Sequence, residues 1–251
     1  MRIVVVGGTG LIGSALVRLL GEAGHEAVPA SPSTGVDTLT GAGVADVSAG
    51  AAVVVDVTNS PSFEDGPVLD FFTRSTRTLL AAEREAGVGH HVALSIVGTD
   101  RVPASGYLRA KCAQEELIRA GGVPFTIVRA TQFFEFLPMI GAGAVVGDAV
   151  VLPTADLQPV AAADVSAVLA EVAVGVPMNG HLDLAGPDRR PFAGFVGPVL
   201  AAQGDARAVT SSADATYFGA VLERDSLVPT GRARIAPTGF AEWEAGRPAR
   251  V

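Results

Sequence analysis

The feature that most constrains this sequence is a glycine-rich segment that comes directly after its first apolar run. Arg2–Val6 is short and rich in β-branched residues, which is typical of a buried strand in a parallel sheet. The next seven residues read Gly-Gly-Thr-Gly-Leu-Ile-Gly, with glycines at positions 7, 10 and 13. Apolar residues from Leu11 to Ala23 then recur at helical spacing. The pattern predicts a strand, a tight turn and a helix.

Such a turn suits the pyrophosphate of a nicotinamide dinucleotide, because the N–H groups and dipole of a helix N-terminus attract negative charge. A side chain at Gly7 or Gly10 would strain the turn or block the phosphates, and Gly13 allows close packing of the helix on the sheet. The alternative is a tight turn without a ligand, which the complete strand and helix context disfavours. The residues expected to contact the dinucleotide are Gly7, Thr9, Gly10, Leu11, Ile12 and Gly13.

Strand and helix patterns continue to alternate along the chain and predict an α/β fold. Further strands are expected at residues 26–30, 52–57, 91–95, 125–128 and 181–184, and helices at about 67–85, 105–120 and 164–174. This order predicts right-handed βαβ crossovers and a Rossmann-type doubly wound parallel sheet. We expect one domain over residues 1–251, in which residues from about 131 onward contribute a small C-terminal substrate-side lobe.

Composition excludes several classes of function. The net charge of −8 disfavours a nucleic-acid or anionic-lipid partner, and the apolar stretches are too short to span a membrane. Cys112 is the single cysteine and the four histidines lack metal-ligand spacing, so neither a disulfide framework nor a metal site is expected. We expect a soluble cytoplasmic monomer or homodimer that acts on a small molecule.

The segment after the second strand bears on which dinucleotide binds. It reads Ala-Ser-Pro-Ser-Thr-Gly over residues 30–35, and no acidic residue occurs before Asp37. An acidic side chain at this place would hold the ribose 2′-hydroxyl of NAD. Its absence, with hydroxyls at Ser31, Ser33 and Thr34 that can donate to a 2′-phosphate, favours NADP(H) over NAD(H). The alternative is a solvated turn, since these are common turn residues.

Three residues form a candidate catalytic group. Tyr107 and Lys111 are four apart in a predicted helix, so they share one helix face. Ser95 ends the fourth strand, where open α/β sheets place ligand contacts. A carbonyl that accepts hydride needs a proton donor at its oxygen, and a nearby ammonium would lower the pKa of a phenol toward neutrality. We expect Tyr107 to donate the proton, Lys111 to tune it and Ser95 to bind the substrate oxygen.

These motifs resemble the short-chain dehydrogenase/reductase superfamily, and most closely its atypical NmrA-like NAD(P)-binding branch. The resemblance rests on the glycine triplet, Ser95, Tyr107-x-x-x-Lys111 and the segments at residues 94–98 and 127–133, and it fades after about residue 190. It implies a Rossmann domain with Lys111 on the nicotinamide ribose and with Thr58, Asn59 and Ala130 along the cofactor cleft. The branch contains quinone and ketone reductases as well as non-catalytic sensors of NADP redox state.

A phenylalanine-rich segment after the fifth strand is expected near the nicotinamide. Phe133, Phe134 and Phe136, with Met139, would give an apolar wall for an aromatic substrate, although packing between lobes is the alternative. We therefore predict an NADPH-dependent oxidoreductase, of the ketoreductase or quinone reductase kind, that transfers hydride to a carbonyl or quinone of a hydrophobic molecule. The alternatives are a non-catalytic NADP-sensing protein and, third, a sugar-nucleotide epimerase or dehydratase.

Overall fold

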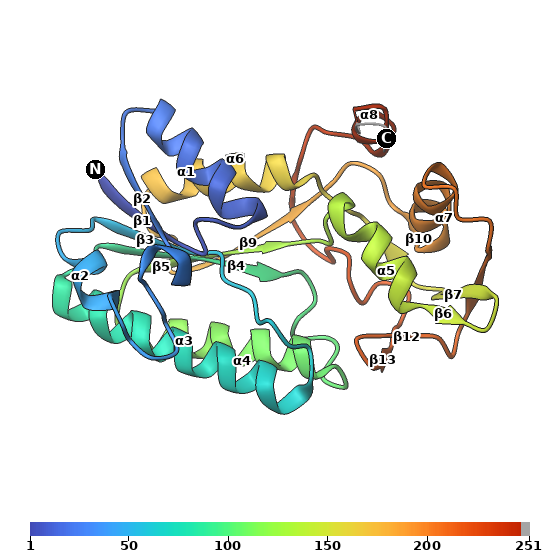
Figure 1. The fold of residues 1–251 in the computed structure, drawn as a ribbon, viewed down its shortest axis with the longest axis horizontal. Helices are drawn as coiled ribbons and strands as arrows, with labels where there is room; N and C mark the ends of the chain where they lie inside the picture. The colour runs from blue at the N-terminus through green and yellow to red at the C-terminus, as the bar shows by residue number, and fades with distance from the viewer. Residues whose placement is uncertain (247–251) are drawn as a thin grey trace.

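A seven-stranded parallel sheet forms the centre of the molecule, whose computed structural model describes residues 1–246 (Figure 1). The strand order is β14-β9-β5-β4-β3-β1-β2. Neighbouring strands pair in parallel throughout, which confirms the predicted Rossmann-type α/β class. The strands are β1 (Arg2–Val6), β2 (Glu26–Ala30), β3 (Val53–Asp56), β4 (His90–Ile96), β5 (Phe125–Ala130), β9 (Gly180–Ala185) and β14 (Arg234–Ile235).

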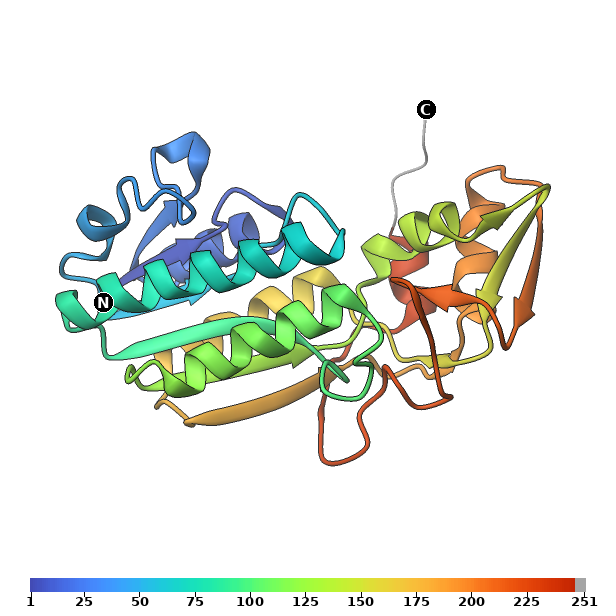
Figure 2. The same ribbon diagram turned by 90° about the horizontal axis from the view of Figure 1, so that it is seen from below.

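Helices cover both faces of this sheet. On one face lie α1 (Leu11–Glu22) and α6 (Ala162–Val174). The opposite face carries α2 (Val44–Ser48), α3 (Asp65–Ala86) and α4 (Gly106–Ala120), and the two long helices α3 and α4 run side by side (Figure 2). Each layer buries its own apolar cluster against the sheet. Burial on both faces explains the continuous apolar runs of β1 and β3.

The predicted helices and strands of this sheet occur within a few residues of their expected bounds, but three elements of this part of the molecule were not predicted. Residues 31–52 contain a short 3₁₀ helix, η1 (Pro32–Thr34), and α2, with no strand between β2 and β3. The edge strand β14 is only two residues long and pairs with β9. Within residues 1–246, no helix is both long and apolar enough to pass through a lipid bilayer.

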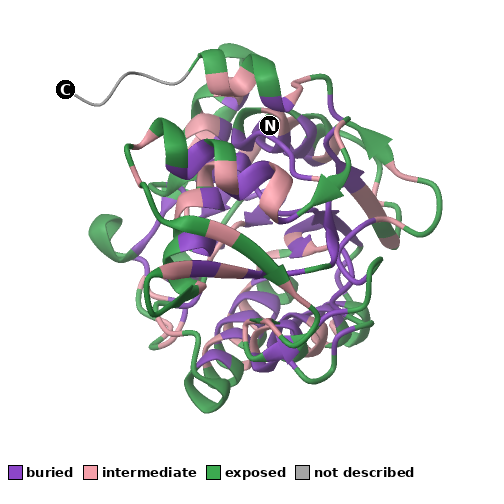
Figure 3. Cartoon of the chain, turned by 90° about the vertical axis from the view of Figure 1, so that its right-hand side faces the viewer, coloured by how far each residue is buried: buried purple, intermediate pink, exposed green. Residues whose placement is uncertain are grey.

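A smaller lobe lies beyond the C-terminal ends of the strands. It contains the helices η2 (Phe134–Phe136), α5 (Leu137–Gly143), α7 (Ala193–Ala202) and α8 (Phe240–Ala245) and the short strands β6 (Val145–Val146), β7 (Ala149–Pro153), β8 (Asp156–Leu157), β10 (Arg190–Pro191), β11 (Ala208–Ser212), β12 (Thr216–Tyr217) and β13 (Ala220–Val221). Its core is separate from those of the sheet, and the rings of Phe134, Phe192 and Phe195 are fully buried in it. Figure 3 looks at this end of the molecule, with buried segments inside and exposed ones outside.

The chain crosses between the sheet and this small lobe several times. After η2, α5, β6, β7 and β8 it returns to the sheet through α6 and β9, and it returns again through β14. Residues after position 131 therefore contribute both to the lobe and to the sheet. The small lobe therefore lies over the C-terminal ends of the strands.

Candidate functional site

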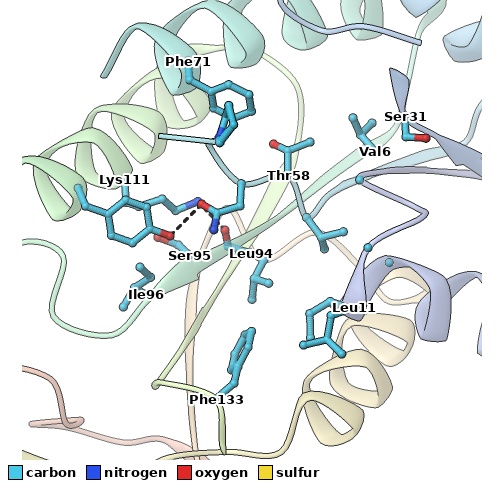
Figure 4. A pocket seen from close by; sticks show the side chains of 18 of the residues that line it. Val6, Leu11, Ser31, Thr58, Phe71, Leu94, Ser95, Ile96, Lys111 and Phe133 are labelled. Carbon is cyan, nitrogen blue, oxygen red and sulfur yellow. Dashed lines mark hydrogen bonds between the residues drawn. The ribbon is translucent and has the colours of Figure 1, made fainter. Parts of the chain in front are cut away.

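One long cavity of about 720 Å³ runs along the C-terminal edge of the sheet. It is lined by residues of the glycine loop, of the segments after β2, β3, β4 and β5, of α4 and of the small lobe. Figure 4 shows Ser31 and Val6 toward one end, and Lys111 and Ser95 toward the other. This is the edge at which open α/β sheets bind their ligands, and a cavity of this size accepts a ligand larger than a single ring system.

The glycine loop lies at the start of α1 and its geometry requires glycine at several positions. Gly7 has φ of +83°, a left-handed conformation that other residues rarely adopt. A Cβ on Gly13 would come within 2.2 Å of the Gly7 carbonyl oxygen, so the constraint there is contact between α1 and the loop itself. Gly8, which was not predicted, lies so close to the neighbouring strand that a Cβ would come within 2.7 Å of the Pro29 Cα.

This loop leaves backbone N–H groups without a helical acceptor in residues that line the cavity. The first helical hydrogen bond of α1 runs from the Ser14 N–H to the Gly10 carbonyl, so the N–H groups of the first three helical residues have no helical acceptor. The first turn of α1 carries no acidic side chain. All six loop residues predicted to contact a dinucleotide line the cavity, so the loop has the free donors and the open space that a pyrophosphate needs.

Two glycine substitutions separate the packing of the loop against α1 from the binding of a ligand. We expect Gly13→Ala to destabilise the protein by about 1–3 kcal/mol and to abolish dinucleotide binding, because its Cβ overlaps backbone atoms. At Gly10, φ is −82° and an added Cβ would meet only the Gly7 carbonyl oxygen, at 3.4 Å. Gly10→Ala should therefore fold normally and lose affinity, as urea unfolding and calorimetric titration would show. Unchanged affinity in Gly10→Ala would contradict this account of the loop.

The far end of the cavity, next to β2, differs in part from the prediction. Ser31 lines the cavity, whereas Ser33 and Thr34 do not: the Ser33 hydroxyl is 2.8 Å from that of Ser31, and the Thr34 hydroxyl accepts from the Ser31 N–H. Asp37 does line the cavity, although it comes later in the sequence than the position considered for an acidic residue. Hydrogen bonds, chiefly from the Leu39 N–H, lower the pKa of Asp37 and keep it charged.

The segment after β3 brings a polar pair into the cavity. Asp56 ends the strand, and its Oδ1 accepts from both the N–H and the hydroxyl of Thr58, at 2.9 and 2.7 Å. The next residue, Asn59, accepts a hydrogen bond from the Tyr107 hydroxyl at 3.0 Å through its Oδ1, drawn as the dashed line in Figure 4. Thr58, Asn59 and Tyr107 all line the cavity. The structure thus joins the predicted cofactor segment to the predicted proton donor.

Tyr107 lies in an aromatic environment that raises its pKa. Its ring is 5.2 Å from that of Phe63 and 4.9 Å from that of Phe218, which reaches over from the turn between β12 and β13. Burial raises the pKa of Tyr107 to about 12, and the hydrogen bond to Asn59 only partly opposes this. The expectation that Lys111 would lower this pKa is corrected, because burial dominates and the ammonium has other partners.

Lys111 is the only lysine in the chain and is buried below Tyr107 on α4. Its Nζ donates to the Leu94 carbonyl at 2.9 Å and to Gln114 Oε1, and it lies 4.4 Å from the centre of the Phe72 ring. Gln114 in turn donates to Asp56. Burial lowers the pKa of Lys111 to about 8, although the charge of Asp56 opposes the shift.

The lowered pKa of Lys111 predicts how stability depends on pH. Between about pH 8 and 10.5 the unfolded chain holds a proton on this lysine that the folded chain has released, so this group raises the free energy of unfolding as pH rises. The slope is at most about 1.4 kcal/mol per pH unit. We expect urea unfolding to show this rise in the wild type relative to Lys111→Met. Curves that stay parallel from pH 7 to 10 would contradict the assignment.

Ser95 also lines the cavity, but its hydroxyl is committed elsewhere. It donates to Glu115 Oε1 at 2.6 Å, and Arg129 donates to both oxygens of the same carboxylate, at 2.9 and 2.7 Å. A hydroxyl has one hydrogen to donate. In this arrangement Ser95 cannot also donate to a substrate oxygen, so its predicted role requires the bond to Glu115 to break. Burial alone would raise the pKa of Glu115, but Arg129 and Ser95 outweigh it and lower the pKa.

The predicted apolar wall is present in part. Phe133 and Phe136 line the cavity and their rings stack at 5.4 Å, with Met139 beside them. The prediction that Phe134 belongs to this wall is wrong. Its ring is fully buried in the core of the small lobe, 5.1 Å from that of Trp243, and it does not line the cavity. Ala130, predicted on the cofactor side, lines the cavity at the end of β5.

Several residues of the site were not predicted. Gln114 and Glu115 follow Lys111 by three and four positions, so helical spacing could have indicated that they share its face. Phe63 and Phe218 come from loops far apart in the sequence, and no local pattern places them on Tyr107. Residues 1–246 contain no cluster of three or more His, Cys, Asp or Glu side chains arranged to hold a metal ion.

No protein-family model and no curated protein matches this sequence, but solved structures do resemble the chain. MoeE5, in complex with UDP-glucuronic acid and NAD, is 20% identical with a TM-score of 0.73, over 98% of this chain and 97% of that one. A short-chain dehydrogenase/reductase superfamily protein from Agrobacterium tumefaciens with bound NAD is 18% identical with a TM-score of 0.69, over 96% and 94%.

The NADPH-dependent quinone oxidoreductase QOR2 of Escherichia coli, complexed with NADPH, is 18% identical with a TM-score of 0.65, over 84% of this chain and 78% of that one. At these identities the likeness concerns the fold. The glycine loop, the cavity and the strand order agree with it. The chain therefore has a Rossmann-type α/β fold like that of these three proteins.

Proposed function

We propose that this protein is an NAD(P)H-dependent oxidoreductase that reduces a carbonyl or quinone group of an apolar, aromatic small molecule. The observation that carries the proposal is the continuity of the cavity from the glycine loop to Tyr107. One end offers unpaired backbone N–H groups at a helix N-terminus, and the other offers a protonated phenol among aromatic rings. Nicotinamide supplies the hydride when it is bound there.

Each residue then has a definite task in the reduction. Tyr107 donates the proton to the substrate oxygen, and its pKa of about 12 keeps it protonated at neutral pH. Asn59 holds the phenol in place before substrate arrives. Two pairs of rings that line the cavity, Phe63 with Phe218 and Phe133 with Phe136, give it an apolar wall that favours a planar apolar substrate.

Two features at the β2 end favour different dinucleotides. The Ser31 hydroxyl can donate to the 2′-phosphate of NADPH, as the sequence predicted. Asp37 places a negative charge in the same part of the cavity, which repels a phosphate and suits the ribose hydroxyls of NADH. The ratio of the two dissociation constants, measured in the wild type and in Asp37→Asn, reports which feature dominates: relief of repulsion should tighten NADPH in the variant.

The charge of the cavity lining bears on the sugar-nucleotide alternative. MoeE5 was solved with a UDP-sugar, which carries a diphosphate of its own in addition to that of the NAD. Among residues 1–246, Lys111 is the only cationic side chain that lines this cavity, and it is buried on protein partners. Diphosphates are usually bound by arginine or lysine. The lining therefore favours an uncharged substrate.

The proposal is tested by oxidation of NADPH and NADH, followed at 340 nm, against quinones and aromatic ketones. Oxidation that depends on an apolar acceptor supports it. Tight binding of the dinucleotide without oxidation of any acceptor would replace it with the sensor alternative. Redox-neutral conversion of a UDP-sugar with the dinucleotide retained would replace it with the epimerase or dehydratase alternative.

A further inference from the structure

Gln114 is a buried polar residue that the proposed reduction does not use. It lies on α4, three positions after Lys111, and is 1% exposed. Its Oε1 accepts from Lys111 Nζ, and its Nε2 donates to Asp56 Oδ2 at 3.0 Å. An ammonium group only donates and an ionised carboxylate only accepts, so a single orientation of the amide satisfies both partners. Gln114 therefore links a cation and an anion of the buried interface between α4 and the sheet.

Asp56 extends this link to the turn that follows β3. Its other oxygen, Oδ1, accepts from the N–H and the hydroxyl of Thr58, at 2.9 and 2.7 Å. The adjacent Asn59 accepts at its Oδ1 from the Ser60 N–H at 2.9 Å and from the Tyr107 hydroxyl at 3.0 Å, the bond drawn in Figure 4. Both oxygens of the carboxylate are thus occupied, and a rotation that frees one disturbs the other. A path of hydrogen bonds and one peptide link joins Lys111 to Tyr107 through Gln114, Asp56, Thr58 and Asn59.

The path begins and ends on the same helix. Tyr107, Lys111 and Gln114 follow one another at spacings of four and three along α4, so they share one face. Asp56 ends β3 and Asn59 lies three residues further on, so the other half of the path belongs to the edge of the sheet. The path and the helix together form a closed ring, which holds the turn after β3 against α4 at two points. Gln114 makes one of these contacts and Tyr107 makes the other.

We propose that Gln114 is a positioning residue, which holds Lys111 and the Tyr107–Asn59 pair in a fixed relation through Asp56. Neither Gln114 nor Asp56 lines the cavity, so both act through the residues that do. The amide carbonyl holds the ammonium of Lys111, and the amide N–H keeps the Asp56 carboxylate turned toward the turn after β3. The proton donor and the lysine therefore keep one spacing when a reacting group binds. An effect on turnover rests on the proposed function, but the link itself does not.

The first test uses the fact that Lys111 is the only lysine of the chain. Protein that is isotope-labelled at lysine gives a single side-chain NMR signal, whose shift reports the protonation of this amine. The midpoint of its titration should lie at about pH 8 in the wild type. Gln114→Leu removes an acceptor from the ammonium and should lower the midpoint by about one pH unit, whereas Gln114→Glu adds a carboxylate and should raise it by about as much. The other charges that act on this amine, Asp56 and Glu115, are kept in both variants.

The second test asks whether Gln114 acts on the turn that carries Asn59. The two side chains share no hydrogen-bond partner, so independent roles would give additive losses of stability. If Gln114 holds the turn, Asn59→Ala should cost less in either Gln114 variant than in the wild type, as urea unfolding of the single and double variants would show. In a protein that reduces ketones, Gln114→Leu should also lower kcat about 10-fold, with KM and the dissociation constant of the dinucleotide changed by less than about 2-fold.

A glutamine elsewhere in the chain provides the control, and the outcomes separate this inference from the proposed function. Gln203→Leu makes the same change at the end of α7, outside the cavity, and should leave the Lys111 signal and kcat unchanged. A Lys111 midpoint that does not move in the expected direction in a folded Gln114 variant would overturn the inference, and so would strictly additive losses of stability. Either result leaves the reductase standing if the wild type oxidises NADPH with an apolar acceptor. Shifted midpoints and non-additive double variants in a protein that oxidises nothing support the inference and overturn the reductase.

Discussion

Tyr107→Phe is expected to lower kcat for ketone reduction by about 10²-fold or more, with little change in the dissociation constant of the dinucleotide. The substitution removes the hydroxyl and keeps the ring that packs on Phe63 and Phe218. Without the hydroxyl, the alkoxide that forms on the substrate has no donor at this place. Steady-state kinetics and calorimetric titration of the same preparations measure the two quantities.

The other tyrosine of the chain provides a matched control. Tyr217 also lines the cavity, and its ring is 4.6 Å from that of Phe218. Tyr217→Phe should reduce kcat by less than about 3-fold, because its hydroxyl has no role in proton transfer. Equal losses in the two variants, or near-normal turnover in Tyr107→Phe, would contradict the assignment of Tyr107 as donor.

The direction of the pKa shift also predicts a pH profile. Because burial raises the pKa of Tyr107 to about 12, the phenol stays protonated across the neutral range and can donate in reduction. The reverse reaction, oxidation of an alcohol, needs the phenolate, so its rate should rise with pH up to at least pH 10. A plateau of alcohol oxidation already at pH 7 would show that the bound dinucleotide lowers the pKa of this tyrosine.

Glu115→Ala is expected to destabilise the protein by about 3–5 kcal/mol. The Glu115 side chain is 1% exposed and pairs with Arg129, which is 7% exposed. Removal of the carboxylate leaves Arg129 with Asp100 as its remaining partner and leaves the Ser95 hydroxyl without its acceptor. The midpoint of urea unfolding, with the slope checked for two-state behaviour, measures the effect.

A surface partner of the same carboxylate serves as the control. Arg119 also pairs with Glu115, but its side chain is 40% exposed. Solvent screens such a pair, so Arg119→Ala should cost no more than about 1 kcal/mol. The pKa of Glu115 is lowered in the folded state, so its contribution is present above the pKa of a free glutamate and is lost as pH falls below it. Equal losses in the two variants would contradict the buried assignment of the Arg129 pair.

Most of the central fold follows from local pattern in the sequence. β1, α1, α3 and α4 have apolar positions at the spacing of their elements, and glycine ends α3 at residue 87 in a left-handed conformation. The two-residue strand β14 has no such pattern, because only pairing with β9 makes it a strand. The short α2 likewise carries too few residues for a helical period to be recognised.

The sequence predicts which residues form much of the site, but not how their side chains are oriented. Helical spacing alone places Tyr107 and Lys111 on one face of α4. The direction of the Ser95 hydroxyl, in contrast, depends on Glu115 from α4 and Arg129 from β5, which meet only in the folded chain. Phe134 fits the pattern of an apolar wall as well as Phe133 does, and only the packing of the small lobe separates them.

Titration of the purified protein with NADPH and with NADH by calorimetry tests the central claim most directly, namely that the cavity from the glycine loop to Tyr107 is a dinucleotide site. The account predicts binding of at least one dinucleotide at one site per chain, in the micromolar range or tighter, and loss of that binding in Gly10→Ala while the variant remains as stable as the wild type. Absence of binding at millimolar concentrations of both dinucleotides would contradict it.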